Sequence, residues 1–365
     1  MTDYDLTLVT PKYPPHSGGA ARYYGLLTTE LSDRDRIDQI TVLTSPHESA
    51  PLVERRDEAA VYRILPRSGS GSRVQRTILF LLRQILLVVA ISLLCLVRDD
   101  HVIQIHSTVA FVGRIGFNHV LDRMFQGLSS VSGSKFVLDI RDQHTIPTSV
   151  NGFDAIICAS ESICNEFNRV NRTSDVTVVH LRVPVDIDAI RGHDKDRRIA
   201  EAVPDRYICF VGDISAAKGT KQVVEAAAGI DAPPVVLVGD PVDETGRKLV
   251  SSLPEHVSHL GVLSHDEALQ VIDGATMLVL PSESEGFPRV ILEAIALGTP
   301  VVVSATVPEL VDAAGVRNLD SRSVAAIRNA LQTEISDEQQ SYQIHQHDVG
   351  HVCTDLIAFH RSLLG

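Results

Sequence analysis

Short β-branched runs that alternate with helical segments constrain the fold of this chain more than any other feature of its sequence. Strands that alternate with helices form parallel sheets assembled from βαβ units. The first series of predicted strands comprises Leu6–Val9, Ile40–Leu43, Val102–Ile105, Phe136–Ile140, Ala155–Cys158 and Val176–Val179. The second series comprises Tyr207–Val211, Val235–Val238, His259–Leu260, Met277–Leu280 and Pro300–Val303. Two such series in tandem predict an α/β chain with two Rossmann-like, doubly wound parallel-sheet domains, and 365 residues are enough for two cores.

The predicted helices lie between these strands, at Lys221–Ala228, Asp266–Asp273 and Pro288–Leu297. The polar stretch Ile190–Asp205 is rich in Arg and Asp, and we expect it to link the two domains. Ligands of open α/β sheets bind beyond the carboxyl ends of the strands. We therefore expect the functional residues in loops that follow strands, in a cleft where the two sheets face each other.

One apolar segment, Thr77–Val97, is long enough to cross a membrane. Arg83 and Gln84 interrupt it, and predicted strands of one sheet lie on both sides of it, so a span would divide a domain across the bilayer. Two interpretations fit better: a buried helix of the first domain, or a helix that lies in a membrane surface.

Composition and charge limit the classes of partner. The net charge is −13, aromatic residues are 5% of the chain and Trp is absent, which argues against nucleic acid as a partner. The five cysteines are scattered without C-x-x-C spacing, so they predict neither a disulfide framework nor a zinc site. Because Met1–Thr10 leads directly into a predicted strand without a signal segment, we expect a cytoplasmic location.

The most informative motif follows the predicted strand Met277–Leu280, where the chain reads PSESEGFPRVILEA from Pro281 to Ala294. Pro288 suits the first turn of a helix, so Gly286, Phe287 and Pro288 lead the chain into a helix N-terminus. Free amides and the helix dipole favour a diphosphate there. Glu285 is placed to accept hydrogen bonds from sugar hydroxyls, and Glu293, further along the helix, to reach ribose hydroxyls.

This string resembles the E-x7-E signature of family 4 glycosyltransferases, retaining enzymes with the GT-B fold, in which the two acids match Glu285 and Glu293. The resemblance implies a nucleotide-sugar donor held by the C-terminal domain and an acceptor held by the N-terminal domain. On this basis we predict an acceptor-side domain at residues 1–189 and a donor-binding domain at residues 190–345. The resemblance also implies that a helix within residues 346–365 packs back on the N-terminal domain.

A second motif, FVGDISAAKG at residues 210–219, places Lys218 in a loop between a strand and a helix. A lysine there supplies a cation to the donor phosphates in place of Mg²⁺. Family members usually carry an additional arginine near Gly212, where this chain has Asp213. Lys218 is therefore expected to be the main phosphate cation.

The predicted first domain contributes three further loops. Gly18 and Gly19 follow the first strand, and the absence of side chains at paired glycines lets a backbone approach a phosphate closely. The resemblance implies that His106 contacts the donor sugar, although a polar cap on the strand end is equally compatible with the sequence. It also implies that the loop with Asp139, Arg141 and Asp142 faces the acceptor; the alternative is a structural ion pair.

Three D-x-D strings, Asp33–Asp35, Asp186–Asp188 and Asp194–Asp196, resemble the motif of metal-dependent transferases. Only Asp186–Asp188 has a suitable context, and the GT-B interpretation puts it near the domain junction, so we expect no metal site and no cofactor.

These observations predict a retaining, metal-independent glycosyltransferase of hexosyltransferase type, which transfers a sugar from a nucleotide-diphosphate sugar to a glycan or lipid-linked acceptor. We expect it in the cytoplasm, with peripheral attachment to the inner face of the membrane as an option that Thr77–Val97 provides. Two alternatives stay open: a nucleotide-sugar epimerase of the same fold, and a non-catalytic nucleotide-binding scaffold in glycan assembly.

Overall fold

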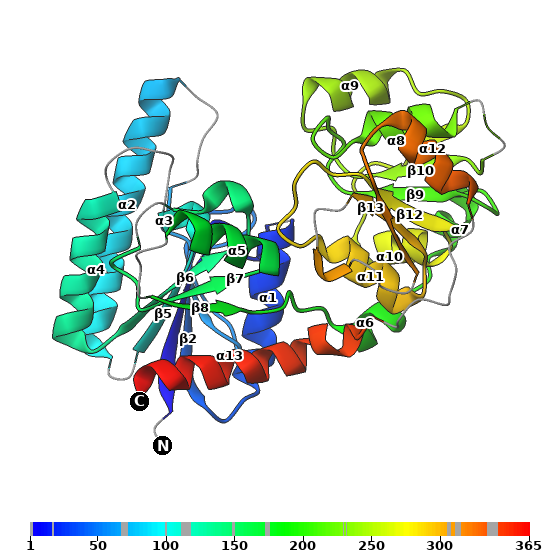
Figure 1. The fold of residues 1–365 in the computed structure, drawn as a ribbon. Coiled ribbons are helices and arrows are strands. Elements are labelled where there is room, and N and C mark those ends of the chain that lie inside the picture. The colour runs from blue at the N-terminus through cyan, green and yellow to red at the C-terminus, as the bar shows by residue number, and fades with distance from the viewer. Residues whose placement is uncertain are drawn as a thin grey trace. The chain divides into compact units, whose positions relative to one another are not determined.

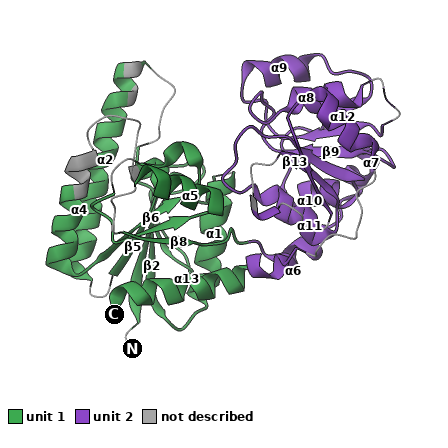
Figure 2. Ribbon diagram, viewed as in Figure 1, with its two compact units in different colours: residues 1–184, 349–365 green, residues 185–348 purple. Residues whose placement is uncertain are grey.

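The computed structural model describes residues 3–16, 18–66, 72–98, 101–110, 118–147, 150–171, 176–228, 230, 232–304, 308–310, 315–333 and 342–365. The chain divides into two compact units (Figure 2). Unit 1 comprises residues 1–184 and 349–365, and unit 2 comprises residues 185–348. The chain therefore passes between the units twice, at Pro184–Val185 and at Asp348–Val349.

Unit 1 is an eight-stranded sheet with the strand order β3-β4-β2-β1-β5-β6-β7-β8. Its strands are β1 (Tyr4–Val9), β2 (Ile37–Leu43), β3 (Val53–Arg55), β4 (Ala60–Tyr62), β5 (His101–His106), β6 (Lys135–Ile140), β7 (Ala155–Cys158) and β8 (Thr177–His180). Its helices are α1 (Gly19–Ser32), α2 (Arg73–Val97), α3 (Ser107–Ala110), α4 (Asn118–Ser132), η1 (Gln143–Thr145), α5 (Glu161–Val170) and α13 (Val349–Leu364).

Unit 2 is a six-stranded sheet with the order β11-β10-β9-β12-β13-β14. Its strands are β9 (Ile208–Val211), β10 (Val235–Val238), β11 (Val257–His259), β12 (Met277–Leu280), β13 (Val301–Ser304) and β14 (Val316–Leu319). Its helices are α6 (Ile187–Arg191), α7 (Arg197–Ala202), α8 (Thr220–Ala227), α9 (Glu244–Ser251), α10 (His265–Asp273), α11 (Arg289–Leu297), η2 (Pro308–Leu310), α12 (Val324–Gln332) and η3 (Ile344–His347).

The predicted class, two doubly wound parallel sheets, is confirmed. The exception is the edge pair β3–β4, which is antiparallel and which the sequence analysis did not predict. Central strands such as β1, β7 and β10 are buried on both faces, as expected for sheets covered by helices on both sides.

Helices cover the sheet of unit 1 in two groups. Helix α1 packs against α13, and α2 packs against α4 (Figure 1). The chain moves from β1 to β2 toward one edge of the sheet and from β5 to β6 toward the other edge. Because both crossovers are right-handed, their helices, and with them the two groups, cover opposite faces. In the core, the hydroxyl of Tyr4 on β1 hydrogen-bonds Nδ1 of His360 on α13 at 2.9 Å. The last helix therefore belongs to the core of unit 1.

The stretch Ile190–Asp205, which we expected to link the domains, lies inside unit 2. It contains the end of α6 and all of α7. Asp196 caps α7 by accepting the Arg198 amide at 2.7 Å, and Ile199 is buried, so a charged surface conceals a packed helix. At the actual crossing, Val185 forms a β-bridge with Asp348, so the two connecting segments lie side by side.

Candidate functional site

Strand order brings the predicted site loops to the switch point of each sheet. In unit 2 the chain runs outward from β9 to β10 and β11, then returns so that β12 pairs with β9. In unit 1 the corresponding return brings β5 beside β1. Crevices that bind ligands form where strand order reverses. The loops after β9 and β12 carry Lys218 and Glu285. Gly18–Gly19 lie between β1 and α1, and His106 is the last residue of β5.

The β9 and β12 loops are bound together by their main chains. The amide of Glu283 donates to the carbonyl of Ala217 at 2.8 Å. Gly219 adopts φ +72°, and a Cβ there would lie 2.7 Å from the carbonyl oxygen of Pro281, so only glycine fits. This packing brings Lys218 Nζ into an ion pair with Glu285 Oε1. Their side chains are 27% and 11% exposed, so the pair is partly shielded but open to a ligand.

Arg322, in the loop that follows β14, is a residue that the sequence analysis missed. Its guanidinium donates to the carbonyls of Pro281 (2.6 Å), Ala216 (3.0 Å) and Ala217 (2.9 Å). It thereby clamps both loops that form the Lys218–Glu285 pair. A basic residue just beyond an edge strand was the available signal, but β14 itself was not predicted.

Helix α11 begins directly after Glu285-Gly286-Phe287, with Pro288 at its N-cap position. Phe287 is buried, and the centre of its ring lies 5.3 Å from the centre of the His347 ring. Pro288 makes no side-chain cap, and in the first turn of α11 the amide of Ile291 donates to the Pro288 carbonyl at 3.1 Å. Glu293, in the second turn, is 8% exposed, and its Oε1 lies 3.9 Å from Nδ1 of His265.

The two glycines of unit 1 differ in their structural constraint. Gly18, at the N-cap of α1, has φ +104° and ψ 171°, a conformation that favours glycine. The Nζ of Lys12 lies 3.8 Å from the point where a Cβ of Gly18 would stand. At Gly19 a Cβ would meet no described atom within 4 Å. The described parts of the protein therefore leave room for a side chain at position 19.

His106 ends β5 and is held in one tautomer. Its Nδ1 accepts the Thr108 amide at 3.2 Å, and an amide can only donate, so the proton of the neutral ring lies on Nε2. Burial lowers the pKa of His106 to about 4, although Asp139 raises it in part. The ring is thus a neutral donor at physiological pH.

The β6 loop holds a buried charge network. Asp139 is fully buried and accepts hydrogen bonds from Tyr24 (2.9 Å), Gln104 (2.8 Å) and Arg141 Nε (2.6 Å). The Arg141 guanidinium also lies 3.8 Å from the centre of the Tyr23 ring. This is the structural ion pair that the sequence left open as the alternative for Asp139 and Arg141. Asp142 is exposed and caps η1 through the His144 amide at 2.8 Å.

Two of the three D-x-D strings begin with a helix cap. Asp186 caps α6 by accepting the Ala189 amide at 2.8 Å, and Asp196 caps α7. Among the described residues, His, Cys, Asp and Glu form no group of three that could hold a metal ion.

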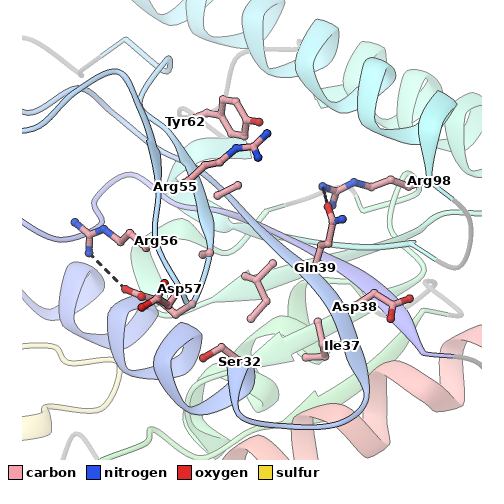
Figure 3. Close-up of a pocket in the computed structure, with 13 residues that line it drawn as sticks. Ser32, Ile37, Asp38, Gln39, Arg55, Arg56, Asp57, Tyr62 and Arg98 are labelled. Carbon is pink, nitrogen blue, oxygen red and sulfur yellow. Dashed lines mark hydrogen bonds and ion pairs between the residues drawn. The ribbon is translucent and has the colours of Figure 1, made fainter.

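A pocket of about 350 Å³ in unit 1 lies away from these loops, at the amino end of β2 (Figure 3). Three of its charged lining residues form ion pairs: Arg98 with Asp5 at 3.4 Å, and Arg56 with Glu58 at 3.7 Å. It contains none of the predicted site residues, and it lies at the end of the sheet opposite to the switch point.

Comparison with known proteins finds sequence similarity between unit 2 and glycosyl transferases. Residues 193–346 match the family model described as glycosyl transferases group 1. A D-inositol 3-phosphate glycosyltransferase of Mycobacterium tuberculosis is 33% identical over 146 residues, which cover 36% of this chain and 29% of the relative. The match thus spans less than a third of that relative.

Solved structures match over the whole chain. Sucrose-phosphate synthase of Thermosynechococcus elongatus has a TM-score of 0.70 at 16% identity, covering 99% of this chain and 96% of its own. HepE of Anabaena, in complex with UDP and glucose, has a TM-score of 0.69 at 16% identity and covers 98% of this chain and 100% of its own. At this level of identity the likeness establishes the fold, and that fold is GT-B.

Proposed function

We propose, from the match of residues 193–346 to glycosyl transferases group 1, that this chain is a glycosyltransferase that takes its sugar from a nucleotide-diphosphate donor. The observation that carries the proposal is the Lys218–Glu285 pair at the switch point of unit 2, beside the N-terminus of α11. A cation and the dipole of a helix N-terminus suit a diphosphate, and a carboxylate suits sugar hydroxyls. HepE, which shares the fold, was solved with UDP and glucose.

The donor is held by unit 2 in this proposal. Lys218 and the N-terminal dipole of α11 stabilise the charge that develops on the leaving diphosphate. In the free protein the Glu285 carboxylate is the partner of Lys218. When the donor binds, its diphosphate takes the place of that carboxylate beside Lys218, and Glu285 is then free to accept hydrogen bonds from the sugar. Glu293 binds the ribose, and its contact with His265 positions it.

Unit 1 supplies the acceptor side. Gly18 and Gly19 offer backbone amides at the N-terminus of α1, with Lys12 nearby as a cation. His106 donates from Nε2 to the donor sugar. The buried Asp139–Arg141 pair keeps the β6 loop in shape, and exposed Asp142 is the member of that loop that can contact a glycan or lipid-linked acceptor. We propose further that the transferred sugar is a hexose, that the transfer retains the configuration of the sugar, and that the protein acts in the cytoplasm.

Donor binding is the first test. A donor that binds only the folded protein at 100 times its Kd adds about 2.7 kcal/mol of stability, roughly 5–10 °C in melting temperature for a unit of this size. We expect one member of a panel of UDP- and GDP-sugars to give this shift, measured by thermal denaturation. Lys218→Ala should abolish it, whereas Lys221→Ala, an exposed lysine paired with Glu225 on α8, should retain it. If no nucleotide sugar shifts the wild-type protein, the proposal fails.

Metal removal is the second test, because a lysine and backbone amides replace the metal in this account. Transfer is expected to proceed at the same rate in excess EDTA as in buffer with Mg²⁺ or Mn²⁺. Loss of activity in EDTA that Mn²⁺ restores would overturn the metal-independent assignment.

Product analysis separates the remaining candidates. The scaffold is favoured by Asp213, an exposed acid where family members carry an arginine. A transferase consumes donor only with acceptor, an epimerase converts the donor sugar without acceptor, and a scaffold binds donor and leaves it unchanged.

A further inference from the structure

Helix α2 exposes an apolar stripe along its whole length. The helix has 25 residues, about 37 Å at 1.5 Å per residue. The apolar window within Thr77–Val97 has a mean hydropathy of 2.6, and only 28% of its residues are buried. The exposed apolar side chains, each between 40% and 77% exposed, are Val74, Ile78, Leu82, Ile85, Leu86, Val89, Leu93, Leu96 and Val97. Their spacing of three and four residues puts them on one face, and soluble monomers seldom expose so long an apolar surface.

The opposite face of α2 is fixed to unit 1. Leu87 and Ile91 are fully buried. Arg83 donates to the carbonyl of Thr108 at 3.3 Å, and Gln84 donates to the carbonyl of Val109 at 3.0 Å. The helix connects β4 and β5, which belong to the same sheet. A helix that crossed a bilayer would break these contacts and separate the two strands, so α2 must meet lipid along its side.

The charge of this region differs from that of the rest of the chain. Residues 59–98 contain six arginines and no acidic residue, in a protein with a net charge of −13. Arg63 and Arg83 are buried, and Arg98 pairs with Asp5 at 3.4 Å. Two of these arginines, Arg73 and Arg76, begin α2 itself. An exposed apolar face on a helix whose only charged residues are arginines is typical of helices that lie in an anionic lipid surface.

We propose that α2 docks unit 1 on an anionic lipid bilayer, with its axis parallel to the surface and its apolar stripe in the acyl boundary. A second copy of the chain fits the same stripe less well. Because α2 has no acidic residue, helix pairing would set arginines against arginines without the ion pairs that fix such interfaces. Lipid phosphates supply the negative charge that the helix lacks.

Docking also has a consequence for the candidate site. Thr108, whose carbonyl accepts from Arg83, donates its amide to Nδ1 of His106. The helix that meets lipid thus holds the loop that carries His106, and an acceptor embedded in that bilayer would be presented to unit 1. This consequence rests on the proposed function, whereas the docking itself does not.

Vesicle flotation without donor or acceptor tests the docking. The full chain is mixed with vesicles of phosphatidylcholine alone, or of phosphatidylcholine with phosphatidylglycerol. We expect the wild-type protein to float with the anionic vesicles at least about tenfold more than with the neutral ones. The double variant Leu82→Gln, Leu93→Gln should stay at the bottom, because it removes apolar area without adding charge. Val262→Gln, a residue of unit 2 that is 69% exposed, is the matched control and should float like the wild type.

Three outcomes would overturn the proposal. Wild-type protein that does not float excludes lipid as the occupant. A dimer in sedimentation analysis that the Leu82/Leu93 variant dissociates would assign the stripe to a second copy. Resistance of the membrane-bound chain to alkaline carbonate would assign α2 to a bilayer span. Equal melting temperatures of wild type and variants show that the result does not come from unfolding, and donor binding stays measurable whichever outcome is found.

Discussion

Lys218→Ala is expected to lower the turnover of sugar transfer by about 10²–10³-fold, the effect of removing one preorganised donor at the point where negative charge develops. The physical reason is that Lys218 is the cation that the β9 and β12 loops place at the switch point, and Asp213 offers no substitute. Steady-state kinetics with the donor found by thermal shift would measure it. The control is Lys221→Ala, three residues along the chain. It has the same net charge as Lys218→Ala and should leave turnover unchanged.

Glu285→Gln distinguishes the two members of the pair. This substitution removes the carboxylate that competes for Lys218, so the affinity for the free nucleoside diphosphate should stay the same or increase. Transfer should nevertheless fall, because the sugar loses a charged acceptor. Parallel losses of diphosphate affinity in Lys218→Ala and Glu285→Gln would mean that the pair is only a structural contact between two loops.

Asp139→Ala is expected to destabilise unit 1 by about 3–5 kcal/mol, the usual cost of removing one partner from a buried ion pair. Asp139 is fully buried, and the substitution would leave the Arg141 guanidinium without its carboxylate and Tyr24 and Gln104 without their acceptor. Urea denaturation followed by circular dichroism would show the first transition at a lower midpoint, since the two units need not unfold together.

Asp142→Ala, three positions along the same loop, provides the control for this measurement. Asp142 is exposed, and its side chain caps the short helix η1 through the His144 amide. Its replacement should cost no more than about 1 kcal/mol. Equal destabilisation by the two substitutions would show that the Asp139 network contributes little beyond the shape of the loop.

Sequence periodicity predicted the repeated βα units and the strand–loop–helix setting of Lys218, Glu285 and Pro288, because these features are local. It missed the edge strands β3 and β14 and the strand β4 beside β3, each of three or four residues. Polar residues such as Arg317 and Asn318 lie within β14. Short half-exposed strands lack the continuous apolar run that identifies a central strand. Missing β14 also hid Arg322, whose partners lie 41 residues (Pro281) to 106 residues (Ala216) earlier in the chain.

Strand order could not be read from the sequence, since it depends on pairing between distant segments. The return of β5 beside β1 and of β12 beside β9 decides which loops meet. The same holds for Asp139, whose partner Tyr24 lies 115 positions away. The aspartate was visible as a polar residue at a strand end, but only the packing of α1 on the sheet distinguishes a buried ion pair from a ligand contact.

The double passage of the chain between the units makes unit 2 an insertion in the sequence of unit 1. Its two ends enter and leave together, where Val185 pairs with Asp348, and the core of unit 1 is completed by α13 only after unit 2 has been synthesised. A genetic exchange of codons 185–348 would therefore replace the whole of unit 2 as one cassette and leave the Tyr4–His360 contact intact. If unit 2 holds the donor as proposed, recombination at this one junction changes donor specificity and leaves the sequence of unit 1 unaltered.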